Sequence, residues 1–202
     1  LETDELNSNL KYVQFITNPH TYMSFPNNML YPNSTNSSYT FLHACRRGKT
    51  PLSSSYDNNG RIFQDADRNW LSGFHGTRDG GVWYHEGWLN HNSQESEKNW
   101  AIHGDIAQKG WFSSYVSGNR KPTSGYYTAT GGNGSLDYDK LRINTGKYSA
   151  EICDFHIHEM VIWKVQLSEA DTVTAMGVLE TSVWGSDGSG GDGDTGGAPP
   201  KV

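Results

Sequence analysis

The sequence predicts an all-β protein, an antiparallel two-layer sandwich that closes with one short C-terminal helix. Turn signals rich in Gly, Asn and Asp recur along residues 57–146, and aromatic or β-branched segments of strand length lie between them. Residues 151–163 alternate with the period of a strand. This strand continues directly into a helix that has a clear start signal.

Aromatic residues carry most of the apolar surface of the chain. Its 202 residues include 7 Trp, 11 Tyr and 7 Phe, and its mean hydropathy is −0.71. Aromatic side chains bury large areas and keep a polar tip, which suits thin sandwiches and faces that contact sugars. The formal net charge of −6 argues against nucleic acid or an anionic membrane as a partner. No apolar run approaches the roughly 18 residues needed to span a membrane, so membrane insertion is not expected.

The chain divides by composition into three parts. Residues 1–9 are acidic and polar, and we expect a mobile arm or a segment ordered only by a neighbour. Residues 10–184 hold the folded domain. Residues 185–202 are rich in Gly and Asp and end in Pro, which predicts a flexible tail or linker. The strands expected within the domain are 22–25, 39–46, 61–64, 70–74, 82–89, 100–105, 111–116, 141–144 and 151–163.

The last strand and the helix carry the most specific pattern. Period two places one set of side chains on one face: Cys153, Phe155, Ile157, Val161 and Trp163. It places the other set on the opposite face: His156, His158, Met160 and Ile162. Ser168 stands where a helix N-cap belongs, with Glu169 and Asp171 in the first turn.

Three segments resemble the laminin G-like group of the concanavalin A-like lectin/glucanase superfamily. They are residues 38–46 (SYTFLHACR), residues 70–76 (WLSGFHG) through 87–89 (GWL), and residues 152–179. The third segment contains a Phe-x-Ile-x-Glu strand at Phe155, followed by Trp163 and the helix start at residues 167–170. The resemblance covers about residues 10–181. It implies a jelly-roll sandwich outside the cell that binds glycans, proteins or other copies of itself, often with calcium.

Some relatives in this superfamily hydrolyse β-glucans through three clustered acidic residues on one strand. This chain has no such triplet, and its nearest acid pairs are Asp65 with Asp67 and Asp137 with Asp139. We interpret both pairs as solvated turn residues, with a calcium loop at Asp65 or Asp67 as the alternative. A glycoside hydrolase is therefore a remote alternative.

The candidate ligand-binding residues lie on or beside the central strands. They are Trp70, His75, Trp83, Tyr84, His85 and Trp88. Rings that share an open sheet face could stack on sugars, whereas alternation could equally bury some of them in the core. His156 and His158 could bind zinc or copper, but a polar, solvent-side strand face explains them as well.

Two further features bear on the cellular setting. The sequons at Asn33, Asn36 and Asn133 are candidate N-glycosylation sites and favour a secreted glycoprotein. Cys45 and Cys153 lie in strands that the resemblance makes neighbours, so they are candidates for a disulfide, with two buried thiols as the alternative.

The sequence thus predicts a non-enzymatic extracellular module of the laminin G or lectin type, within a larger cell-surface or matrix protein. Its partner would be a glycan or a protein. The alternative is a structural subunit of an extracellular filament or matrix, assembled through its termini. The basic residues 46–49 could then receive an acidic segment of another copy, or could simply form a solvated strand end.

Overall fold

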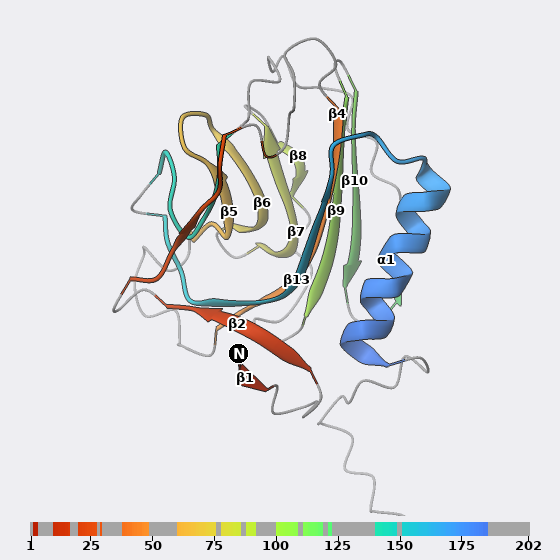
Figure 1. The fold of residues 1–202 in the computed structure, drawn as a ribbon, viewed down its shortest axis with the longest axis horizontal. Helices are drawn as coiled ribbons and strands as arrows, with labels where there is room; N and C mark the ends of the chain where they lie inside the picture. Colours follow the sequence, from red (N-terminus) through yellow and green to blue (C-terminus); the bar gives the residue numbers. More distant parts are fainter. Residues whose placement is uncertain are drawn as a thin grey trace, which may run out of the picture.

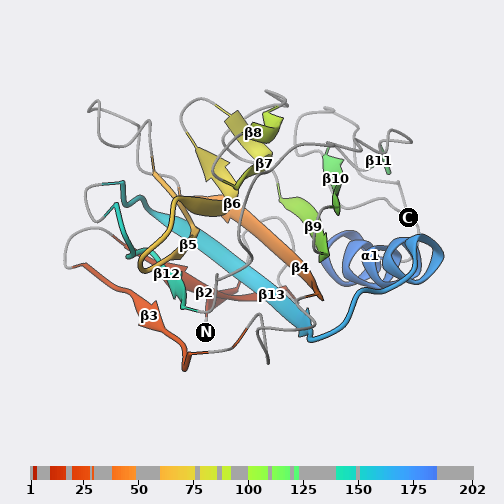
Figure 2. The ribbon, with the colours of Figure 1, turned by 90° about the horizontal axis from the view of Figure 1, so that it is seen from above.

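Two antiparallel sheets face each other (Figures 1 and 2). The computed structural model describes residues 2–3, 10–16, 20–27, 29, 38–48, 60–75, 78–85, 88–91, 100–108, 111–118, 121–122, 140–148 and 151–185. Within these ranges the side chains of residues 2–3, 47, 74, 78–85, 88–91, 107–108, 111–118 and 121–122 are not described. The predicted all-β antiparallel sandwich with one helix is confirmed, and its layout is compatible with a jelly roll.

The two sheets draw their strands from all parts of the chain. The seven-stranded sheet has the order β1 (Glu2–Thr3), β2 (Lys11–Phe15), β13 (Phe155–Trp163), β4 (Ser38–Arg47), β9 (Ala101–Gln108), β10 (Trp111–Gly118) and β11 (Lys121–Pro122). The six-stranded sheet has the order β3 (Met23–Ser24), β12 (Leu141–Ile143), β5 (Phe63–Asp65), β6 (Trp70–His75), β7 (Arg78–His85) and β8 (Trp88–His91).

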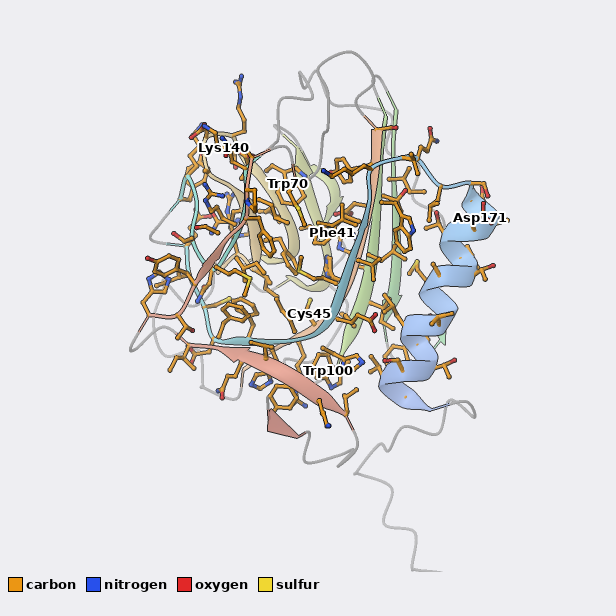
Figure 3. All side chains as sticks on the ribbon, viewed as in Figure 1. Phe41, Cys45, Trp70, Trp100, Lys140 and Asp171 are labelled. Carbon is orange, nitrogen blue, oxygen red and sulfur yellow. The ribbon has the colours of Figure 1, made fainter. Side chains whose placement is uncertain are left out.

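The main core lies between the sheets and is largely aromatic. Phe41 of β4 meets Phe63 of β5 edge to face, with ring centroids 4.9 Å apart. Phe15 and Phe155 stack at 4.8 Å. Figure 3 shows Phe41 and Trp70 in the space between the two layers. Such ring pairs add to the stabilisation from area burial, which compensates for the small number of aliphatic residues.

A second apolar layer lies outside the seven-stranded sheet, under α1 (Glu169–Trp184). The buried helix residues recur with helical spacing and form one face: Thr172, Met176, Leu179 and Val183. They pack with Leu42 and Ala44 of β4 and with Ile102 and Ile106 of β9. Both views show the helix over this outer face (Figures 1 and 2). No helix in the described part of the chain is both long and apolar enough to cross a membrane.

The helix begins as the sequence predicts. The hydroxyl of Ser168 accepts a hydrogen bond from the backbone N–H of Asp171 at 3.1 Å, which confirms the N-cap. The helix ends at Gly185, whose φ of 84° suits a residue without a Cβ, and whose N–H donates to the Thr181 carbonyl.

A β-bulge in β13 corrects the predicted face assignment. Ile157 pairs with Cys45 and Glu159 pairs with Ala44, so His158 is an extra residue without a counterpart in β4. After the bulge, Met160 and Ile162 pack against the core between the sheets, whereas Trp163 packs under the helix. Placing Trp163 on the face of Phe155 was therefore wrong, because one extra residue exchanges the two faces.

Two further expectations are corrected. The single strand expected at residues 82–89 is a pair: β7 and β8 run antiparallel, with Tyr84 opposite Trp88. Within the predicted mobile arm, Glu2 and Thr3 form β1 and pair with Tyr12 and Lys11 of the chain's own β2. The rest of that arm and the predicted tail beyond Gly185 lie outside the described residues.

Candidate functional site

The structure divides the predicted ligand-binding residues into separate groups. Trp70 is fully buried, and the centroid of its ring lies 6.3 Å from that of Phe41. It therefore belongs to the core and cannot stack on a ligand at the surface. Alternation in β6 turns its side chain toward the opposite sheet. His75, at the end of β6, is partly exposed. The side chains of Trp83, Tyr84, His85 and Trp88 lie outside the described part of the structure.

Strand register still sorts these four residues into rows. His85 stands opposite Trp70, which packs in the core between the sheets, and Trp83 stands opposite Ser72, whose hydroxyl contacts His43 and His103 of the other sheet. Tyr84 stands opposite Leu71 on one side and opposite Trp88 on the other. Leu71 lies between Trp70 and Ser72 in the strand and thus has the opposite orientation. Tyr84 and Trp88 therefore stand in the row of Leu71, which alternates with the rows of Trp70 and Ser72.

The candidate calcium residues organise a turn. The carboxylate of Asp65 is buried and accepts backbone N–H groups of Asp67, Arg68 and Lys140 at 2.8, 2.9 and 3.0 Å. Burial raises the pKa of Asp65, and these three donors oppose the rise. Asp67 is exposed and pairs with the ammonium of Lys140, which lowers the pKa of this carboxyl. These oxygens are already satisfied by donors of the chain, and a neighbouring ammonium repels cations, so the loop is poorly suited to calcium.

The two histidines of β13 do not form a shared metal site. His156 is buried rather than solvent-facing: it accepts a 3.0 Å hydrogen bond from Nε of Arg46 and packs on the ring of Tyr12. His158, the bulge residue itself, contacts the Lys11 carbonyl and the Ser182 hydroxyl. Each imidazole thus has its own contacts.

Arg46 is also buried, so this residue belongs neither to a solvated strand end nor to a surface that receives an acidic segment, while the side chain of Arg47 and residue 49 lie outside the described part of the structure. The guanidinium carbon of Arg46 lies 5.4 Å from the centroid of the Tyr12 ring and 5.0 Å from that of Trp100. Cation–π contacts of this kind are worth about 2 kcal/mol when desolvated. Arg46 therefore stabilises the packing of β2 against β4 and β13, and it is not available to an acidic segment of another copy.

Cys45 and Cys153 are both buried thiols that no disulfide joins, which is the alternative to the predicted disulfide. Burial, and then the neighbouring Cys153, raises the pKa of the Cys45 thiol well above its ordinary value. A buried thiol that resists ionisation is a poor nucleophile.

A buried polar cluster between the sheets was not predicted from the sequence. His43 of β4 stands directly opposite His103 of β9, and Asp105 follows two residues later in β9. His43 Nε2 lies 2.8 Å from the hydroxyl of Ser72 in β6, and His103 Nδ1 lies 3.4 Å from the same hydroxyl. Burial, and then the neighbouring His103, lowers the pKa of His43 well below its usual value. The spacing of His103 and Asp105 was the available signal, but their pairing with His43 needed the strand register.

Several predicted sites fall on residues that the structure does not describe. These are the glycosylation candidates Asn33, Asn36 and Asn133, and the acid pair Asp137 and Asp139.

Comparison with solved structures finds related folds. The binding domain of Paraclostridial Mosquitocidal Protein 1 aligns with a TM-score of 0.55 and 11% identity, over 83% of this chain and 43% of that chain. The binding domain of botulinum neurotoxin serotype G aligns with a TM-score of 0.48 and 10% identity, over 90% of this chain and 42% of that chain. This chain therefore spans less than half the length of these matches. At such identities, the similarity to the mosquitocidal protein shows a shared fold alone.

No protein-family model matches the chain, and no curated protein matches its sequence. The laminin G-like family is therefore not confirmed, although the β-rich sandwich that the resemblance implied is present.

Proposed function

We propose that this chain is a non-enzymatic extracellular binding module, and that its ligand contacts the outer face of the six-stranded sheet. The observation that carries this proposal is the asymmetry of the two sheets. The helix α1 covers the outer face of the seven-stranded sheet, whereas none of the described helical residues lies over the six-stranded one. A sheet face that no described helix covers, with aromatic residues in β7 and β8, is the kind of surface that binds sugars or a partner protein.

Tyr84 and Trp88 are the residues that we assign to this surface. Tyr84 and Trp88 are paired in neighbouring strands. They stand in the row of Leu71, which alternates with the rows of the buried Trp70 and Ser72. Leu71 of the same row is itself buried, so the proposed contact surface begins at Tyr84 and extends toward β8. The mosquitocidal match is a binding domain by its description, which is consistent with this role.

The described acid pair supports a binding rather than a hydrolytic role. Retaining glycosidases need two accessible carboxyl groups about 5–5.5 Å apart. Asp65 is 1% exposed, and its carboxylate accepts hydrogen bonds from three backbone N–H groups. Asp67 forms an ion pair with Lys140. Neither carboxyl is therefore placed to attack or protonate a glycosidic bond.

A glycan array with and without EDTA tests the proposal. We expect binding to a defined set of glycans that Tyr84→Ala and Trp88→Ala each reduce at least tenfold, a loss of about 1.4 kcal/mol. Tyr22→Ala is the matched control, because Tyr22 is 62% exposed but lies near β3, far along the sheet from β8. We expect binding to persist in EDTA, because the loop at Asp65 is poorly suited to calcium.

The structural-subunit alternative predicts a different result. In that case, no glycan binds, and the chain forms larger species in size-exclusion chromatography as its concentration rises. The pairing of β1 with the chain's own β2 does not favour this outcome, because it uses Glu2 and Thr3 within one copy. The outer edge strand β11 contains Pro122, which lacks an N–H for pairing with a further strand.

A further inference from the structure

Three metal-ligating side chains converge between the two sheets. His43 and His103 are directly opposed on the neighbouring strands β4 and β9, and Asp105 lies two residues after His103 and so shares its face. One potential ligand atom from each of the three lies within 4.8 Å of the others. All three side chains are fully buried. The register of β4 and β9 therefore builds this arrangement into the interior of the seven-stranded sheet.

The carboxylate of Asp105 is the feature that the rest of the structure does not explain. His103 Nε2 lies 3.0 Å from Oδ1, so the two groups are in contact. The contact lacks the geometry of a hydrogen bond, and neither carboxylate oxygen has a hydrogen-bond partner among the residues that the structure describes. A buried carboxylate without such partners is costly, and buried charges in proteins are normally paired or bound to metals.

We propose that His43, His103 and Asp105 bind one Zn²⁺ ion between the sheets. Two imidazoles and one carboxylate are ligands that zinc accepts, and a fully buried set of ligands suits a structural ion. The ion would satisfy the Asp105 carboxylate and compensate its charge.

Two neighbouring side chains are candidates for the fourth ligand. The Ser72 hydroxyl lies 2.8 Å from His43 Nε2, and the Cys45 sulfur lies 3.4 Å from His43 Nδ1. Zinc binding replaces one of these two contacts of His43. A bond to Ser72 would join β4 and β9 of one sheet to β6 of the other, whereas a bond to Cys45 would remain within the seven-stranded sheet.

Refolding of the full chain tests the proposal, since a buried ion must enter before the sheets close. The protein is unfolded in guanidinium with EDTA and refolded with Zn²⁺, with Co²⁺ or with EDTA. Metal content after gel filtration is then measured by mass spectrometry, together with the melting temperature. We expect about one metal per chain and a higher melting temperature than in the sample refolded with EDTA. Sub-stoichiometric metal and identical melting temperatures in the three samples overturn the proposal.

Variants locate the ion. Asp105→Asn keeps the size of the side chain, and we expect it to lose most of the bound metal and the metal-dependent rise in melting temperature. Glu159→Gln is the matched control, because Glu159 is an exposed carboxylate on β13 of the same sheet, and it should bind metal like the wild type. Wild-type metal binding in Asp105→Asn refutes the assignment. If Asp105→Asn does not fold, the metal content of His103→Asn is compared with that of the wild type. Equal metal content in the two proteins then refutes the assignment.

The Co²⁺ spectrum identifies the fourth ligand. Coordination by sulfur gives an intense charge-transfer band that Cys45→Ser removes, whereas coordination by Ser72 leaves only the weaker visible bands. A buried polar network without metal predicts something else: Asp105→Asn raises the melting temperature equally with and without Zn²⁺, because it removes a buried charge. That result contradicts the zinc site.

Discussion

The same substitution, Gly to Ala, is expected to have opposite effects at Gly60 and Gly177. A Cβ built on Gly60 would lie 2.6 Å from Sγ of Cys153 and closer still to its Cβ. Real Cβ atoms do not approach other atoms this closely, so the backbone at Gly60 or at Cys153 must move. A Cβ at Gly177, within α1, meets nothing within 4 Å.

The expected magnitudes follow from these contacts. Overpacking a core typically costs 1–3 kcal/mol in free energy of unfolding. The added methyl would meet the Cβ of Cys153, and both Cβ atoms are fixed directly to the backbone, so we expect a cost of about 3 kcal/mol. For a chain of this size, that lowers the melting temperature by about 6–12 °C. Gly177→Ala removes a flexible residue from a helix interior and is expected to stabilise by about 0.8–1 kcal/mol, or about 2–4 °C.

Urea unfolding followed by circular dichroism measures both effects, and a double mutant tests the cause. Cys153→Gly removes the Cβ and the sulfur and leaves the Cys153 Cα at 3.3 Å from the added methyl. We expect Gly60→Ala to cost 1–3 kcal/mol less in this background than in the wild type. An equal cost in both backgrounds refutes the reasoning, because it means that Gly60 does not lie against Cys153.

Two other predictions test the turn at Asp65 and the bulge in β13. Asp65→Asn presents an NH₂ group to one of the three backbone donors and should cost about 1–3 kcal/mol, while Asp67→Asn at the exposed pair should be neutral. Because the pKa of Asp65 is raised in the fold, its wild-type contribution is largest below the ordinary carboxyl pKa of 3.8 and falls as pH rises through the raised value. The stability difference between wild type and Asp65→Asn, from melting curves across the acidic range, should therefore shrink with rising pH; a growing difference contradicts the raised pKa. Deleting His158 removes the bulge and forces apolar residues on one side of it to exchange faces, at about 1.5–3 kcal/mol for each side chain lost from the core, whereas His158→Ala keeps the bulge. Near-ultraviolet circular dichroism should show loss of tertiary packing only in the deletion, and equal spectra for the two variants would contradict the bulge.

Local patterns predicted the elements of this fold because each depends on neighbours in the sequence. The N-cap at Ser168 needs only a hydroxyl three residues before an available N–H, and that bond is present. The aromatic strands around Phe41 and Trp70 were expected for the same reason, since period two is visible in the chain itself. The boundary between β7 and β8 was missed because residues 82–89 contain apolar and aromatic residues on both sides of that boundary.

The candidate site was less accessible to sequence reasoning. Trp70 was grouped with Tyr84 and Trp88 because all are aromatic residues near one another, but the register assigns them to different rows. Arg46 was expected in solvent because arginine is charged, yet the rings of Tyr12 and Trp100 enclose it, and these residues are distant in the sequence.

The amino-acid sequence by itself determined the class of the protein: its strands, its turns and its one capped helix arise from propensities and hydrogen bonds that act over a few residues. Only the tertiary structure decided which side chains share a layer. A single bulge at His158 exchanges the faces of β13, and the pairing of β4 with β9 brings His43 to His103 across 60 positions of sequence. Such contacts depend on strand register, which is fixed by the packing of the whole sandwich rather than by any local run of residues.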